Sequence, residues 1–418
     1  METGKFVLED TLDVGVYLSL TLPDQQFLQF VVNDFEKEFS MSFDYQDKTH
    51  VIFEGSEDNT AFQSHLNFLN SIRPLADSLK QEINAIEGED PRLEPMKRQL
   101  DSLNALVALK QDSMIAAHPD FMSTVLLKAN KEIEMPEFGA SEEEQMKQYR
   151  YFKAHYFDHI DLGDPRVLRT PFLYHRVKYY VDKLTPAHPD SVSQSIDSIM
   201  HWMSPSEDSY RVYLSHFLNS YIKAKIVGYD AVYVHLVDNY YAKGKTPWVQ
   251  EENMLKILDH ANKLRPVLIG ETGADIKVFK EDGTPVSISD IDYEYLVLLF
   301  WAPDCGHCKK SMPDFVEFNE KYAELGVKTF AICTKYRDKV KGCWESVKEK
   351  NMTGFINAAD EFNRSGFKVK YFVDSTPKVY ILDKNREILM KNIGAHQLDA
   401  VFEQILSRKN EATEISDQ

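Results

Sequence analysis

The most informative segment of this sequence is Phe300-Trp301-Ala302-Pro303-Asp304-Cys305-Gly306-His307-Cys308-Lys309-Lys310. An apolar strand runs there directly into two cysteines that are separated by two residues and are placed to open a helix. Two such thiols can close into a disulfide with little backbone movement. The dipole and the free N–H groups of a helix N-terminus stabilise a thiolate on the first of them. This layout predicts a site for thiol–disulfide exchange.

The two cysteines have different predicted roles. Cys305 is the predicted nucleophile, and Cys308 is the predicted resolving thiol that attacks a mixed disulfide formed on Cys305. His307 can carry positive charge near neutral pH, so we predict a catalytic role in which it lowers the pKa of Cys305. The carboxylate of Asp304 acts in the opposite direction. The redox potential therefore stays open at this point.

Metal binding by the same cysteine pair is the weaker interpretation. A structural zinc site needs four ligands, usually two such pairs, and the remaining cysteines, Cys333 and Cys343, lack that spacing. We therefore predict no metal and no bound cofactor, only a redox-active disulfide between Cys305 and Cys308.

The sequence around the motif adds further landmarks. An apolar run at 296–301 precedes it, Pro313 follows it, and strands are predicted at 326–332 and 378–382. With these features, residues 266–410 resemble the thioredoxin fold, specifically the TlpA/ResA branch of bacterial extracytoplasmic thiol-disulfide oxidoreductases. An additional helix at 338–350 and strand at 355–357 are typical of that branch.

The resemblance also implies site residues. Thr376-Pro377 occupies the place of the cis-proline loop that faces the cysteines, so Thr376, Pro377 and Trp301 are predicted substrate-binding positions. The buried aspartate of thioredoxins is replaced by Leu299, which leaves the proton donor for Cys308 unassigned.

Cys333 and Cys343 flank a short polar loop. In an oxidising compartment they could form a second bridge. We favour the alternative that they are a buried strand thiol and a helix thiol, inert because apolar surroundings raise the pKa of a cysteine.

The rest of the chain predicts a multidomain α+β protein. We expect a β-rich N-terminal domain at 1–58, truncated at its start, with strands at 14–20, 27–32, 39–43 and 51–55 that suggest a meander or a sandwich fragment. A helical hairpin arm follows at 59–135, then a helical domain at 136–265 and a thioredoxin-like α/β domain at 266–418. In the arm, an amphipathic helix at 91–117 is predicted to pack antiparallel to the helix before it.

The helical domain resembles an uncharacterised domain found upstream of TlpA-like modules in Bacteroidetes envelope proteins. The phrases that carry this resemblance are 158–162, 169–173 and 230–236. His155 and His159, four residues apart, would face the same way on a helix, but packed amphipathic residues are the favoured interpretation over a metal site.

Composition narrows the classes of function. A net charge of -18 over 418 residues argues against nucleic-acid binding. No apolar run is long enough to span a membrane, and residues 1–25 lack the pattern of an export signal. With the family resemblance, we expect a periplasmic or cell-envelope protein whose export signal is not included in this chain.

The leading hypothesis is a thiol-disulfide oxidoreductase of the cell envelope that exchanges disulfides with client proteins. A membrane thiol carrier is the expected electron donor, and the direction of exchange and the oligomeric state stay open. The alternative is an envelope binding or scaffold protein, or a copper-handling protein, that uses a thioredoxin-like domain.

Overall fold

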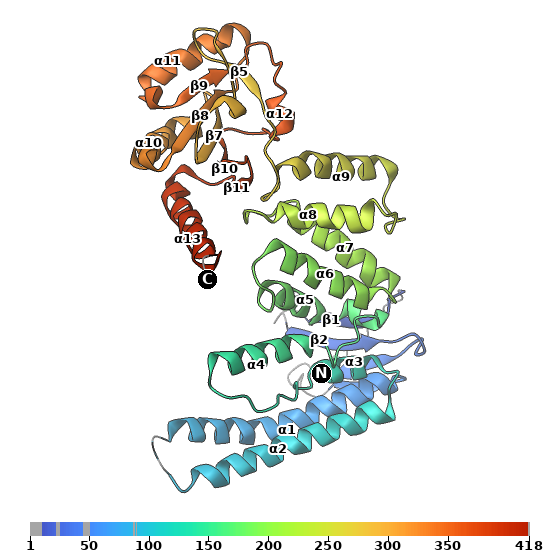
Figure 1. The fold of residues 1–418 in the computed structure, drawn as a ribbon. Helices are drawn as coiled ribbons and strands as arrows, with labels where there is room; N and C mark the ends of the chain where they lie inside the picture. Colours follow the sequence, from blue (N-terminus) through green and yellow to red (C-terminus); the bar gives the residue numbers. More distant parts are fainter. Residues whose placement is uncertain (1–10, 22–25, 45–50, 87, 89, 417–418) are drawn as a thin grey trace. The chain divides into compact units, whose positions relative to one another are not determined.

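A computed structural model describes residues 11–21, 26–44, 51–86, 88 and 90–416. The chain divides into two compact units, residues 1–186 with 194–214 and residues 187–193 with 215–418. Figure 1 shows small sheets and long helices in the first unit and a larger, helix-covered sheet in the second. The predicted fold class, with an N-terminal β-rich part, a helical centre and a C-terminal thioredoxin-like α/β domain, is confirmed.

The N-terminal strands form two separate antiparallel hairpins, β1 (Gly15–Thr21) with β2 (Gln26–Val32) and β3 (Ser40–Phe43) with β4 (Val51–Glu54). A continuous meander is therefore a wrong prediction for these residues. Aromatic packing connects the hairpins instead, because Phe39 contacts both Phe30 and Phe53, with ring centroids 5.8 and 6.1 Å apart.

The predicted helical arm is α1 (Glu57–Ala85) with α2 (Leu93–Ala117), which lie side by side. The predicted stripe along α2, at 93, 96, 100, 103, 107 and 114, is half-buried, whereas most of the remaining helix surface is exposed. The other helices upstream of the larger sheet are α3 (Met122–Ala129), α4 (Glu142–Ala154), α5 (Leu173–Asp182), α6 (Pro189–Met203), α7 (Glu207–Tyr221), α8 (Asp230–Leu236) and α9 (Glu251–Leu264).

The second unit contains a seven-stranded sheet with the order β11-β10-β7-β8-β9-β5-β6. Its strands are β5 (Lys277–Phe279), β6 (Pro285–Ser287), β7 (Tyr295–Trp301), β8 (Val327–Cys333), β9 (Ile356–Ala359), β10 (Lys378–Asp383) and β11 (Ile388–Lys391). Strands β7, β8 and β9 are parallel, and β10 runs antiparallel to β7. The helices of this region are α10 (Gly306–Lys321), α11 (Lys341–Glu349), α12 (Phe367–Lys370) and α13 (Leu398–Ser416).

The central strand β7 is buried on both faces, as its continuous apolar run predicts. Because side chains alternate along a strand, Val297 and Leu299 pack in the core that includes residues of α10, α11 and α13. Leu298 and Phe300 pack in the opposite core with residues of α12. The strand therefore ends in a rigid setting, and the cysteine motif follows it directly.

Candidate active site

Cys305 lies at the junction between β7 and α10, where it is the N-cap residue of the helix. Its Sγ accepts a hydrogen bond from the backbone N–H of Cys308 over 3.3 Å. An N-cap side chain normally supplies an oxygen for these unpaired N–H groups, and here a sulfur takes that place. Negative charge on Cys305 is favoured at this position because the positive end of the helix dipole also points at it.

The two thiols of the motif differ in burial and acidity. Cys305 is partly exposed, whereas Cys308 is 1% exposed. Burial alone raises the pKa of Cys305, but hydrogen bonds from Cys308 and Thr376 and from the N–H groups of Cys308 and His307 outweigh it, so its pKa is lowered. Burial first, and its hydrogen bond with Cys305 second, raise the pKa of Cys308 to about 12. Cys305 is thus the thiol that can ionise and react first.

The Thr376–Pro377 peptide is cis, as the resemblance implied. It directly precedes β10, which pairs with β7 so that Lys378 lies opposite Phe300. This register brings the loop to the end of β7 where the motif begins, and the Sγ of Cys305 lies 3.1 Å from the carbonyl oxygen of Thr376. The loop and the motif therefore form one site, although they are separated by 71 residues of sequence.

His307 and Asp304 are the two neighbours that were predicted to influence the pKa of Cys305. His307 is exposed, and a hydrogen bond from its backbone N–H contributes to the lowered pKa of Cys305. Asp304 pairs with Lys335, with 2.6 Å between Oδ2 and Nζ. That hydrogen bond lowers the pKa of Asp304. The carboxylate is compensated by an adjacent cation and so opposes the thiolate less than its sequence position suggests.

Trp301 is a correction to the predicted substrate-binding set. Its side chain is 2% exposed and packs in the core with Cys308. A side chain that is enclosed in this way cannot contact a client protein. Leu299, at the position of the usual aspartate, lies in the same core and is 0% exposed. The motif therefore has an apolar surface beneath it.

Cys333 and Cys343 form a disulfide, with 6.2 Å between their Cα atoms. The favoured prediction of two inert thiols was wrong, although its placement of one cysteine on a strand and one on a helix is correct. A 3-10 helix at Arg337–Val340 connects the two elements, so that the start of α11 reaches the end of β8. Both residues are almost completely buried.

His155 and His159 do not share a helix face, because α4 ends at Ala154. The Nδ1 of His155 lies 2.6 Å from Asp158, and the Nε2 of His159 lies 3.1 Å from the carbonyl oxygen of Glu132. In the described part of the chain, no group of three or more histidine, cysteine, aspartate or glutamate side chains is arranged to hold a metal ion.

Comparison with protein families places these elements in a known context. Residues 269–406 match the Redoxin family model. We call residues 269–406 the Redoxin domain, after this match. Residues 101–265 match a domain of unknown function, DUF5106. The predicted arrangement, in which a thioredoxin-like domain follows an uncharacterised helical domain, is confirmed.

Several solved structures are similar to parts of this chain. A domain of a possible thiol-disulfide isomerase from Cytophaga hutchinsonii is 28% identical, covers 35% of this chain and 98% of its own, and has a TM-score of 0.33. A thioredoxin-like protein from Bacteroides caccae is 14% identical, with 65% and 98% coverage and a TM-score of 0.49. A thiol:disulfide interchange protein from Bacteroides sp. is 17% identical, with 32% and 88% coverage and a TM-score of 0.30. No curated protein sequence matches the chain.

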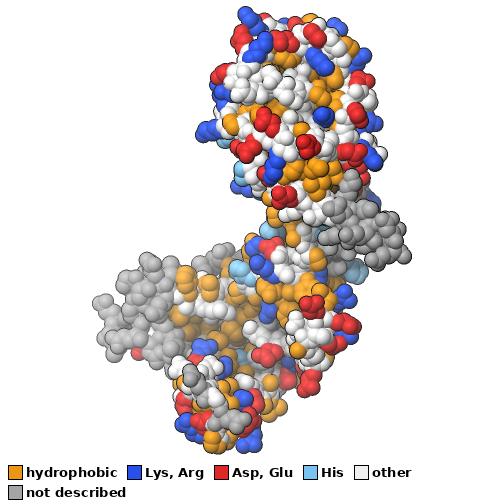
Figure 2. Space-filling model, turned by 60° about the vertical axis from the view of Figure 1, so that its left-hand side comes forward, with side chains coloured by type: hydrophobic (Ala, Val, Ile, Leu, Met, Phe, Trp, Pro, Cys, Tyr) orange, Lys and Arg blue, Asp and Glu red, His pale blue; other side chains and the backbone are white. Residues whose placement is uncertain are grey.

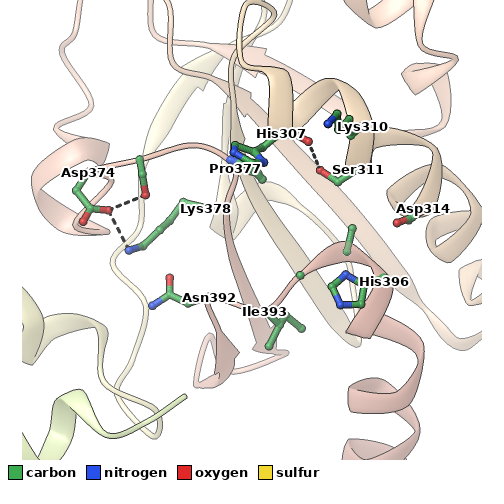
Figure 3. A pocket seen from close by; sticks show the side chains of 13 residues that line it. His307, Lys310, Ser311, Asp314, Asp374, Pro377, Lys378, Asn392, Ile393 and His396 are labelled. Atoms are coloured by element: carbon green, nitrogen blue, oxygen red, sulfur yellow. Dashed lines mark hydrogen bonds and ion pairs between the residues drawn. The ribbon is translucent and has the colours of Figure 1, made fainter. Parts of the chain in front are cut away.

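The Redoxin domain has an open groove of about 590 Å³ beside the cysteine motif. One side is formed by α10, and the other sides come from the cis-proline loop and from the segment after β11 (Figure 3). Its lining residues are His307, Lys310, Ser311, Asp314, Asp374, Ser375, Pro377, Lys378, Asn392, Ile393, Gly394, Ala395 and His396. Of the predicted site residues, His307 and Pro377 thus face this groove.

Sequence reasoning missed the segment after β11, which supplies His396 and Gly394 to the groove. The predicted hairpin at 383–386 was the available signal. Because β11 returns beside β10, the residues that follow it arrive at the same end of the sheet as the residues that precede β10.

On the face shown in Figure 2, lysine and arginine side chains are interspersed with aspartate and glutamate over the upper part of the view, which holds the Redoxin domain. No large area of a single sign is visible there. Such a surface favours local contacts over long-range attraction by a uniform field.

Proposed function

We propose that this protein is a thiol-disulfide oxidoreductase of the cell envelope that exchanges disulfides with client proteins. The observation that carries the proposal is the pairing of an accessible Cys305 thiol of lowered pKa with a buried Cys308 two residues after the helix begins. The Redoxin match supports the same class of chemistry.

The exchange would proceed in two steps. The Cys305 thiolate attacks one sulfur of a client disulfide, which forms a mixed disulfide and releases the other client sulfur as a thiolate. Cys308 then loses its proton and attacks the Sγ of Cys305, which releases the reduced client and leaves a Cys305–Cys308 disulfide. Two electrons pass from the dithiol to the client in total. A dithiol reductant, which we propose to be a membrane thiol carrier, would restore the reduced form.

The high pKa of Cys308 makes the second step the slower one, because Cys308 must lose its proton before it can attack. A thiol whose pKa is about 12 is almost entirely protonated at neutral pH. Leu299 offers no carboxylate at the position that would take up the proton. The client thiolate released in the first step would take up the proton of Cys308. Loss of the Cys308 proton is thus the step that we expect to limit resolution.

The lowered pKa of Cys305 also bears on direction. A stabilised thiolate favours the reduced form of the couple, so the site is more oxidising than one with an ordinary thiol. For His307 we propose that its backbone N–H helps to stabilise the Cys305 thiolate.

An oxidising location is supported by the second bridge. Disulfides persist mainly in secreted and periplasmic proteins, since cytosolic thiols are kept reduced, and Cys333 is joined to Cys343. No helix in the described ranges is both long and apolar enough to cross a membrane.

Trapping of mixed disulfides tests the proposal. We expect full-length Cys308→Ser to accumulate mixed disulfides with envelope proteins, because its Cys305 can attack but cannot be released, and we expect the wild type to reduce insulin in the presence of dithiothreitol. The matched control is C333A/C343A, which leaves both motif cysteines intact and should trap nothing. Absence of trapping together with stoichiometric Cu(I) binding would contradict the enzyme and support the copper-handling alternative.

A further inference from the structure

The groove beside Cys305 has two walls, and a residue with positive φ precedes one wall and begins the other. One wall, 374–378, follows Phe372, which has a φ of 40°. The other wall, 392–396, begins at Asn392, which has a φ of 55°. A positive φ is uncommon for residues other than glycine, and it costs more for phenylalanine than for asparagine. The contacts around these two points therefore show what fixes the groove.

The second wall is anchored by a buried lysine. Lys391, immediately before Asn392, has a side chain that is 2% exposed, and its ammonium group pairs with Asp230 at the start of α8. The same ammonium donates to the carbonyl oxygen of Val267 over 2.5 Å. A buried ammonium is stable only when such partners satisfy it. The end of β11 is thus fixed by residues that precede the Redoxin match at 269.

The first wall is supported by a series of ring contacts. The ring of His260, in α9, lies edge-on against the ring of Phe372, with centroids 5.6 Å apart. The His260 ring also contacts the ring of Tyr233 in α8, with centroids 5.2 Å apart, and Tyr233 is 0% exposed. The support for Phe372 therefore originates in the two helices that precede the Redoxin domain.

Phe372 in turn contacts a residue that lines the groove. The Nζ of Lys378 lies over the Phe372 ring, 5.4 Å from its centroid. The same Nζ bonds to the Oδ1 of Asp374 over 3.2 Å, a contact that is drawn in Figure 3. Asp374 and Lys378 enclose Thr376-Pro377 in sequence, so the cation fixes both ends of the loop that faces Cys305.

We propose that Asp230 and His260 are positioning residues that hold the two walls of the groove and thereby set the affinity for an extended client segment. This inference rests on the proposed function. A preformed groove binds a flexible segment more tightly because fewer degrees of freedom are lost on binding. In this proposal the helical DUF5106 region contributes to the Redoxin site. Asp230 and His260, which contact the two walls, both lie within the DUF5106 match and outside the Redoxin match.

The experiment compares His260→Ala with His260→Phe, because phenylalanine retains a ring against Phe372 and alanine does not. In the full chain, we expect His260→Ala to raise the KM for insulin reduction about two- to tenfold, the range expected for loss of an aromatic contact. The kcat and the rate of Cys305 alkylation by iodoacetamide should change less than twofold. His260→Phe should resemble the wild type in all three measurements.

Hydrogen exchange provides a readout that does not depend on activity. His260→Ala should accelerate amide exchange in 372–378, and Asp230→Asn should accelerate it in 391–396, while the amides of β7 and β8 stay protected. Unchanged exchange in both walls would overturn the proposal, and so would a wild-type KM in His260→Ala. A wild-type chain that does not reduce insulin would contradict the proposed function. In that case amide hydrogen exchange alone would decide whether Asp230 and His260 hold the walls.

Discussion

The backbone N–H of Cys308 donates a hydrogen bond to the Sγ of Cys305 over 3.3 Å. The helix start thus uses its own resolving cysteine to stabilise the nucleophile. Because this stabilisation needs only the local chain, it forms as soon as the strand, the motif and the helix are in place. It also makes the reactivity of the motif directly testable.

The first prediction concerns the pH dependence of Cys305. Its lowered pKa means that the thiolate is present at a lower pH than in free cysteine. Alkylation should therefore rise with pH through a midpoint below that of free cysteine. Since the side chain of Cys308 helps to lower this pKa, Cys308→Ala should move the midpoint to higher pH than Cys308→Ser, which retains a donor. Rates of iodoacetamide labelling between pH 5 and pH 10, followed by mass spectrometry, measure both effects.

Two outcomes would contradict this prediction. One is a midpoint for Cys308→Ser that equals that of free cysteine. The other is an identical profile for the serine and alanine variants, which would show that the side chain at 308 has no influence on the thiolate.

The pair of Asp304 with Lys335 gives a second prediction. Lys335→Gln leaves a carboxylate without its cation beside Cys305, so the pKa of Cys305 should rise and its alkylation at pH 6 should slow by about a few-fold at low salt. D304N/K335Q removes both charges and should restore the wild-type rate. High salt should reduce the difference, because Asp304 is 70% exposed. A rate that does not respond to Lys335→Gln would show that the carboxylate has no effect on the thiolate.

A third prediction addresses the second disulfide. Cys333 and Cys343 are separated by 10 positions, and closing a loop of that size stabilises a fold by about 2–3 kcal/mol in the loop-entropy model. C333A/C343A should lower the stability of the Redoxin domain by about that amount. Cys308 is a suitable reporter because its thiol is 1% exposed in the folded state.

The measurement uses a background in which Cys305 is changed to serine, so that Cys308 is the free thiol in both chains. Its labelling is followed against urea with and without the disulfide. The midpoint should fall when Cys333 and Cys343 are replaced. An unchanged midpoint would indicate that the bridge does not stabilise the domain.

The parts of the site that sequence could predict are those set by local pattern. A few residues are enough to predict the local structure in three places: the apolar run before the motif, the two cysteines and the Thr376-Pro377 step. Trp301 shows the limit of this reasoning. The run indicated a buried strand, but the inaccessibility of its last side chain follows from alternation along β7 and from the helices that pack on that face.

Contacts between distant segments could not be read from the sequence. Lys335 reaches Asp304 because β8 is parallel to β7 and ends beside it. Cys343 reaches Cys333 through a short 3-10 helix at Arg337–Val340, which no sequence pattern predicted. Asp230 and Lys391, 161 positions apart, pair only because two separate regions of the chain pack together. Sheet order and packing, not residue type, determine all three contacts.

The final prediction concerns Gly394 in the groove. A Cβ at this position would lie 2.6 Å from Cε1 and 2.9 Å from Nδ1 of His396. Gly394→Ala must therefore displace the His396 ring or the backbone that carries it, and both line the groove. We expect the KM for insulin reduction to rise about several-fold while Cys305 alkylation stays unchanged, because the thiolate is stabilised by groups outside this segment.

A second substitution distinguishes the displaced ring from a general loss of structure. G394A/H396A removes the group that the new methyl meets, so it should recover most of the affinity. Gly342→Ala is the matched control, because a Cβ there meets nothing within 4 Å. A Gly394→Ala chain with wild-type KM would show that client segments do not use this end of the groove. Failure of the double variant to recover would place the strain in the backbone between β11 and α13, where the N–H of Gly394 bonds to Gln397 over 3.0 Å.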